Sequence, residues 1–194
     1  MARANFVQKA AKDNEKAGIK KGDSYYWWQL YKSPKQYSKT RPRPSQLTGS
    51  TFLSGYYALQ ERLEDLSIDT LEDLESELNE IAGEIRELGE EQESNKENMP
   101  EGLQEGDTGQ LLQERADGMG EWADSIESME FSLDFDGPKV KCSAEGCEWT
   151  SEDVDGTCPE CGAHSLETDE YTEAVADKIQ ELIDEAQGND PGLS

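Results

Sequence analysis

Histidine is almost missing from this 194-residue sequence, in which His164 is the only one. Metal sites and catalytic constellations that need several imidazoles are therefore excluded. The patterns Gly-x4-Gly-Lys-Ser/Thr, Gly-x-Gly-x-x-Gly and Gly-x-Ser-x-Gly are absent as well. Among 44 carboxylates, no catalytic pair stands out. We expect a protein that is not an enzyme.

Long apolar runs are also lacking. Hydrophobic residues make up 34% of the chain, and the mean hydropathy is −0.89. No run approaches the roughly 20 apolar residues of a membrane-spanning helix, and no apolar signal segment follows Met1. We therefore expect a soluble, cytoplasmic protein without a membrane partner, built from small helical packings and a metal-held module.

Basic residues are scarce outside the first quarter of the chain. The net charge is −26, but residues 1–47 hold 11 Lys or Arg against three acidic residues. Residues 48–194 hold the other 7 basic residues against 41 acidic ones. A basic segment at 1–47 followed by an acidic segment at 48–194 indicates charged partners and says little about the fold. A halophilic source would explain the acidity without any functional meaning.

Cysteine is confined to one short segment, Val140 to Glu167. The four residues form the pairs Cys142-x4-Cys147 and Cys158-x2-Cys161, separated by ten residues. Two short-spaced pairs about 10–20 residues apart are typical of a tetrahedral zinc site, because a hairpin can bring their turns together. We predict a structural Zn²⁺ bound by all four thiolates. The hairpin is expected at Glu148–Thr150 and Val154, with its bend at Asp155-Gly156.

Other uses of these cysteines remain open. Two disulfides would require an oxidising compartment, and a redox Cys-x-x-Cys normally lies between a strand and a helix. Another metal would also fit thiolate ligands. His164 could replace one cysteine, although four cysteines already complete the shell.

Aromatic residues concentrate near the N-terminus. We predict a mobile basic arm at 1–22, then an aromatic β-hairpin and a proline-rich, extended exit at 23–47. Aromatics interleaved with Lys and Arg are typical of single-stranded nucleic-acid sites and of interface anchors. Packing into a core is the alternative for the same rings. The candidate interaction face consists of Trp27, Trp28, Tyr37, Lys39, Arg41 and Arg43.

Apolar stripes at spacings of three and four predict an acidic helical region over residues 48–130. Ser50 and Thr70 are expected to cap the first two helices, Gly89 and the polar run Glu90 to Asn98 to end the second, and Pro100 to Gly109 to form a linker. The second and third helices are expected to form an antiparallel, coiled-coil-like hairpin with narrow seams, open to a partner helix or to self-association. The stripes are Phe52, Tyr56, Leu59, Leu63 and Leu66; Leu71, Leu74, Leu78, Ile81, Ile85 and Leu88; and Leu112, Arg115, Met119, Trp122, Ile126 and Met129, widened by Leu111 and Ala123.

The remaining chain is predicted as a zinc ribbon at 131–168, a C-terminal helix at 169–188 and a free tail at 189–194. The alternating residues 131–136 predict an extra strand before the cysteines. The fold class is therefore α+β and mainly α.

Two resemblances follow from particular residues. The Cys-Pro-Glu-Cys-Gly knuckle at 158–162 and the cysteine spacing resemble a zinc ribbon, a family that binds zinc and contacts nucleic acid or protein. Residues 2–7 and 22–48, which include Tyr25-Tyr-Trp-Trp28 and Arg41-Pro-Arg-Pro44, are similar to the start of uncharacterised phage-encoded proteins. That resemblance implies expression in the cytoplasm of a bacterial host.

Three functions fit these patterns. The first is a zinc-ribbon adaptor or regulator whose acidic helices bind a protein partner, for example a component of replication or transcription. The second is a nucleic-acid-binding protein that uses the basic, aromatic N-terminal region. The third is an acidic DNA mimic that inhibits a host protein.

Overall fold

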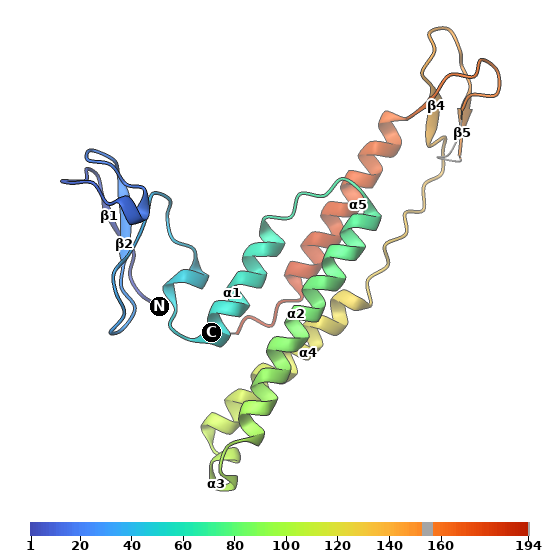
Figure 1. The fold of residues 1–194 in the computed structure, drawn as a ribbon. Coiled ribbons are helices and arrows are strands. Elements are labelled where there is room, and N and C mark those ends of the chain that lie inside the picture. The colour runs from blue at the N-terminus through green and yellow to red at the C-terminus, as the bar shows by residue number, and fades with distance from the viewer. Residues whose placement is uncertain (153–156, 194) are drawn as a thin grey trace. The chain divides into compact units, whose positions relative to one another are not determined.

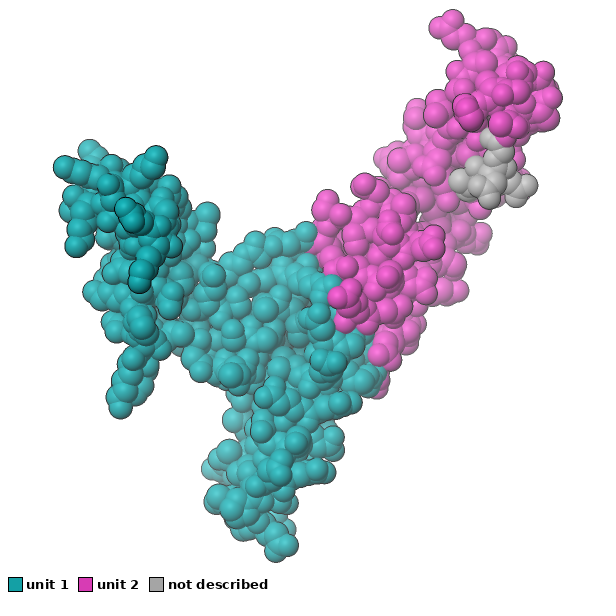
Figure 2. All heavy atoms as spheres, viewed as in Figure 1, with its two compact units in different colours: residues 1–65, 81–123, 191–194 teal, residues 66–80, 124–190 magenta. Residues whose placement is uncertain are grey.

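The computed structural model describes residues 1–152 and 157–193, so Val154 and the predicted bend at Asp155-Gly156 lie outside the described residues. The chain forms two compact units: residues 1–65, 81–123 and 191–194 (unit 1), and residues 66–80 and 124–190 (unit 2) (Figure 2). In the described ranges, none of the helices is long and apolar enough to cross a membrane.

The fold is mainly helical, with two small antiparallel sheets and a long helix pair (Figure 1). The elements are β1 Asn5–Val7, the 3-10 helix η1 Glu15–Ala17, β2 Tyr25–Trp28, β3 Gln36–Ser38, the 3-10 helix η2 Pro44–Leu47, α1 Thr51–Glu64, α2 Leu71–Glu97, α3 Glu101–Gln104, α4 Asp107–Glu127, β4 Val140–Cys142, β5 Thr150–Ser151, β6 Ser165–Glu167 and α5 Asp169–Gly188.

The N-terminal sheet has three strands in the order β1-β2-β3. The predicted hairpin between β2 and β3 is present, with Trp27 opposite Tyr37. The predicted mobile arm at 1–22 is wrong, because Asn5–Val7 pairs with β2 and Ile19 is only 2% exposed. A two-stranded hairpin is marginal in water, and β1 supplies the third strand that it needs.

Helix α1 follows its predicted stripe. Phe52, Tyr56, Leu59 and Leu63 are buried, whereas Leu66 lies beyond the helix and is half-buried. The predicted cap is present, since Ser50 Oγ accepts a hydrogen bond from the Leu53 amide at 3.3 Å. Within unit 1, α1 packs on α4 through Tyr56 and Trp122, whose rings meet edge to face at 6.0 Å.

Helix α2 begins after Thr70, whose Oγ1 accepts from the Asp73 amide at 3.1 Å as predicted. The predicted end at Gly89 is wrong, because α2 continues to Glu97. A Cβ at Gly89 would lie 3.1 Å from Met119 Cβ and 3.3 Å from the Ala116 oxygen of α4. Further along, Lys96 Nζ donates to Gln113 Oε1 at 2.7 Å. The two helices are therefore antiparallel here, and the glycine serves close packing rather than termination.

Replacing Gly89 with alanine is expected to destabilise the protein. The new methyl group would press on Met119 and on the Ala116 backbone, and overpacking costs about 1–3 kcal/mol. Higher helix propensity returns only about 1 kcal/mol. The matched control is Gly83→Ala on the same helix, where nothing lies within 4 Å of the new Cβ; this variant should be more stable than wild type. Urea unfolding followed by circular dichroism measures both, and a shift of both midpoints in the same direction contradicts the account.

Unit 2 contains a second sheet, ordered β5-β4-β6, and helix α5. The predicted C-terminal helix at 169–188 is confirmed, with Thr168 as its cap. The predicted strand at 131–136 is not formed. Burial alternates along this segment as the sequence suggests, and Phe135 packs on Tyr171 at 5.3 Å. The described sheets do not include this segment, so the alternation reflects packing on α5 without a strand partner.

The predicted free tail is also wrong for residues 191–193, which belong to unit 1. The Leu193 amide donates to the Tyr56 hydroxyl at 3.2 Å. A Cβ at Gly118 would lie 3.1 Å from Pro191 Cβ. The end of the chain therefore packs on α1 and α4.

Candidate metal centre

Short turns position the four cysteines of unit 2. Cys142 ends β4, and the Cys147 amide donates to the Ala144 oxygen at 3.2 Å. In the second turn the Gly162 amide donates to the Cys158 oxygen at 2.8 Å. Gly146 and Gly162 have φ of 82° and 71°, values that glycine adopts without strain. One glycine in each turn thus reverses the chain beside a cysteine.

The sulfur atoms come together as the spacing predicts. All four thiols are free, and their Sγ atoms lie within 4.8 Å of one another. The shortest separations are 3.4 Å between Cys142 and Cys161 and 3.6 Å between Cys147 and Cys158. Tetrahedral coordination with metal–sulfur bonds of about 2.3 Å places sulfurs about 3.8 Å apart. The cluster can therefore hold one metal ion.

Each sulfur also accepts a hydrogen bond from a backbone amide two residues later. Ala144 donates to Cys142 Sγ at 3.4 Å. The amides of Trp149, Glu160 and Ala163 donate to Cys147, Cys158 and Cys161, respectively. Amide donors stabilise the thiolate, which is the form that binds a metal. The repeated arrangement prepares four anionic ligands around one point.

The four thiols shift one another's pKa values strongly. Burial raises the pKa of Cys158, but the amides of Cys161 and Glu160 and hydrogen bonds from neighbouring thiols lower it further, to about 7. The Trp149 amide lowers the pKa of Cys147, while burial and hydrogen bonds with the other three thiols raise it to about 12. One thiol thus ionises easily and the next resists, as expected for closely spaced groups that repel one another when both are charged.

Two further side chains lie beside the cysteine cluster. His164 is exposed and, within residues 1–152 and 157–193, it is not part of the side-chain group that could share a metal. Glu160 Oε2 lies 3.8 Å from Cys147 Sγ. Sequence reasoning did not single out Glu160, although its position inside the second knuckle is the signal that could have done so.

The candidate interaction face in unit 1 is only partly assembled. Trp28 is 5% exposed, and its Nε1–H donates to the Gln46 oxygen at 2.9 Å, so this ring belongs to the core. Lys39 Nζ pairs with Asp23 at 3.0 Å, and Arg43 pairs with Asp65. Hydrogen bonds from the Lys20 amide and from Lys39 hold the pKa of Asp23 below its ordinary value.

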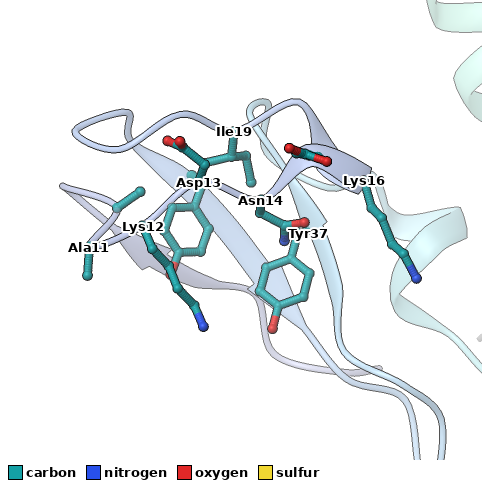
Figure 3. Close-up of a pocket in the computed structure, with 10 residues that line it drawn as sticks. Ala11, Lys12, Asp13, Asn14, Lys16, Ile19 and Tyr37 are labelled. Carbon is teal, nitrogen blue, oxygen red and sulfur yellow. The ribbon is translucent and has the colours of Figure 1, made fainter.

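Tyr37 and Arg41 are exposed, and Trp27 is half-buried. Trp27 and Tyr37 are cross-strand neighbours on one face of the sheet. Sequence reasoning missed Tyr25, Lys12 and Lys16, which line a cavity of about 550 Å³ together with Tyr37 (Figure 3). Lys12 and Lys16 were assigned to a mobile arm because five lysines punctuate that segment; the signal for order was Ile19.

Comparisons of the chain with protein-family models, with curated proteins and with solved structures find no match.

Proposed function

We propose that this chain is a non-enzymatic adaptor. Its zinc ribbon stabilises the fold, and its acidic helices bind a basic protein segment. The observation that carries the adaptor function is an acidic-rimmed apolar groove between α1 and α2 in unit 1. The resemblance of residues 2–7 and 22–48 to phage-encoded proteins supports a bacterial cytoplasm as the working environment, where thiols stay reduced.

Zinc is supported by the ligand set. Four thiolates favour a soft ion with tetrahedral geometry, and zinc imposes no further geometric demand. A shell closed by four sulfurs keeps no position for a water molecule, so the ion would stabilise the fold without catalysis. The three short strands around Cys142, Cys147, Cys158 and Cys161 agree with the ribbon interpretation.

The groove has a volume of about 640 Å³. Leu59 and Leu88 provide its apolar floor, and the small residues Gly55 and Ala58 keep it hollow. Its rim carries Glu84, Glu87 and Glu91 from α2, with Arg62 from α1 paired to Glu84 at 2.8 Å. An apolar floor with an acidic rim complements an amphipathic helix that presents leucine-like side chains flanked by Lys or Arg.

The helix pair supports the same interpretation. Coiled-coil-like packing of α2 and α4 would hold the groove rigid, and a rigid surface loses little entropy when a partner binds. The large negative charge of residues 48–194 would steer a basic partner towards the groove. Proteins of replication and transcription carry such basic segments because they handle nucleic acid.

A charge reversal on one face of α2 tests the groove. The double variant Glu87→Lys/Glu91→Lys should weaken binding of a synthetic Leu/Lys amphipathic helical peptide by ten-fold or more, because two rim attractions become repulsions. The matched control, Glu90→Lys/Glu93→Lys, makes the same charge change beside the α4 packing face, away from the groove; it should change affinity much less. Fluorescence anisotropy with labelled peptide measures both.

A second peptide separates groove binding from general charge attraction. It has the same composition with the leucines scattered, so it keeps the charge and loses the apolar stripe. We expect at least ten-fold weaker binding of this peptide at 150 mM salt. Equal binding of both peptides, or equal loss in the two double variants, would contradict the proposed adaptor groove.

A further inference from the structure

We propose that the N-terminal sheet binds single-stranded nucleic acid, with an unpaired base in the cavity formed by Tyr25, Tyr37, Lys12 and Lys16. This inference is independent of the adaptor function, because none of these residues belongs to the groove or to the cysteine cluster. The proposal rests on one aromatic face, on a lined cavity beside it and on the positive charge around both.

The aromatic face follows from strand geometry. Tyr25 and Trp27 alternate with Tyr26 and Trp28 along β2, so the first two share a face and the last two share the other. Tyr37 lies opposite Trp27 and joins that face, with its ring centroid 6.1 Å from that of Tyr25. Trp28 fixes the opposite face to the Gln46 backbone. On the face with Tyr25, Trp27 and Tyr37, the Tyr37 ring is exposed and the other two rings are half-buried.

The cavity lies between this face and residues 10–19. Lys12 and Lys16 lie on either side of Tyr37 in the view of Figure 3. Its volume of about 550 Å³ falls within the roughly 300–1,000 Å³ usual for small-ligand sites, enough for a nucleobase and its sugar. Asn14 also lines it and offers both a donor and an acceptor for a base edge.

The charge around the cavity favours an anion. Asp13 and Glu15 balance Lys12 and Lys16 in the lining itself. Beyond the lining, the other residues of the 1–47 segment carry nine basic side chains against one acidic residue, Asp23. A phosphate backbone that passes the cavity would thus meet a surplus of lysine and arginine.

The Trp27 ring offers a second surface on which a base could stack. Lys35 Nζ lies 4.3 Å from the centroid of its ring, so the ring is covered by a flexible cation rather than by the core. A base that stacks on Trp27 would displace the ammonium group, which could then reach the adjacent phosphate. Stacking on adjacent aromatics requires unpaired bases, and this requirement favours a single strand over a duplex.

Fluorescence anisotropy of a labelled, mixed-sequence 15-nucleotide DNA strand with the full-length protein tests the proposal. We expect binding at 50 mM salt that exceeds binding of the corresponding duplex. Tyr37→Ala should weaken it about ten-fold, within the roughly 1–3 kcal/mol per stacked base, and Tyr37→Phe should retain it. The control is Tyr31→Ala, which removes an aromatic ring that is 87% exposed and outside the cavity, and it should bind like wild type.

A second variant covers the possibility that Tyr37→Ala fails to fold. Lys12→Gln/Lys16→Gln changes two exposed side chains only. It should lower the slope of log affinity against log salt by about 1.4, since each phosphate contact to a single strand contributes about 0.7. The proposal is overturned if wild type does not bind the strand at 50 mM salt, if it binds duplex equally well, or if this slope is unchanged. Binding of an acidic peptide in place of the strand would also overturn it.

Discussion

Replacing Cys158 with serine is expected to abolish zinc binding and to unfold the β5-β4-β6 sheet, while the helices stay folded. Cys158 is 1% exposed, and two backbone amides donate to its sulfur, so serine can restore neither the ligand nor the packing. Structural zinc in small domains contributes an apparent binding free energy of about 10–16 kcal/mol, most of which is folding energy. Three strands of two or three residues each cannot replace that term.

Metal analysis and amide hydrogen exchange would measure this effect. The variant should contain no zinc, and the Cys142 amide, which donates to the Trp149 oxygen at 3.0 Å, should exchange freely. Far-ultraviolet circular dichroism should keep most of its helical signal. The control is His164→Ala, at an exposed residue next to the cysteines, and it should keep one equivalent of zinc. Retention of zinc by the Cys158 variant would contradict the four-thiolate site.

Replacing Trp122 with alanine is expected to give the largest loss of stability among the helical residues. Its side chain is 1% exposed and meets the Tyr56 ring at 6.0 Å in unit 1. Truncation of a buried aromatic costs about 3–5 kcal/mol, because apolar contact is lost and a cavity stays behind. The truncation should also loosen the packing of Phe52, whose ring stacks on that of Tyr56 with the centroids 6.2 Å apart.

Leu111→Ala is the matched control for this variant. Leu111 lies on the same helix and was predicted to widen the same apolar face, yet it is 41% exposed. Its truncation should cost less than about 1 kcal/mol. Urea unfolding monitored at 222 nm compares the two free energies of unfolding. Equal losses for Trp122→Ala and Leu111→Ala would contradict the packing of α4.

Much of the helical architecture could be predicted from the sequence because its signals repeat. Leu74, Leu78, Ile81 and Ile85 recur every three or four residues, and all four are fully buried. The repeat fixes which face is apolar, but it cannot say which neighbour touches a glycine. Gly89 was therefore taken as a helix end. In the structure, its lack of a side chain leaves room for Met119 of α4 to pack closely against α2.

Short strands were harder to predict. Asn5–Val7 is too short to show a period of two, and it is held by pairing with β2. Residues 131–136 do alternate, yet a strand also needs a partner strand, and this segment packs on α5 through Phe135 instead. Local sequence does not report which distant segments pair with one another.

Of the two candidate sites, the cysteine cluster could be predicted from the sequence, whereas the arrangement of the N-terminal aromatic residues could not. Thiol spacing is a local property, so Cys142, Cys147, Cys158 and Cys161 could be chosen from the sequence alone. Which aromatic side chains of the N-terminal sheet are exposed depends on which side of β2 faces the rest of unit 1. Alternation separates Trp27 from Trp28 but does not say which ring is buried, and the hydrogen bond from Trp28 to Gln46 decides it.

X-ray absorption at the zinc edge of the purified protein tests the central claim most directly. The account predicts a single shell of four sulfur atoms at about 2.3 Å, with no lighter ligand. Such a shell means a closed structural site with no position for water or for His164. A nitrogen or oxygen ligand at about 2.0–2.2 Å, or the absence of zinc from protein purified without chelators, would contradict it.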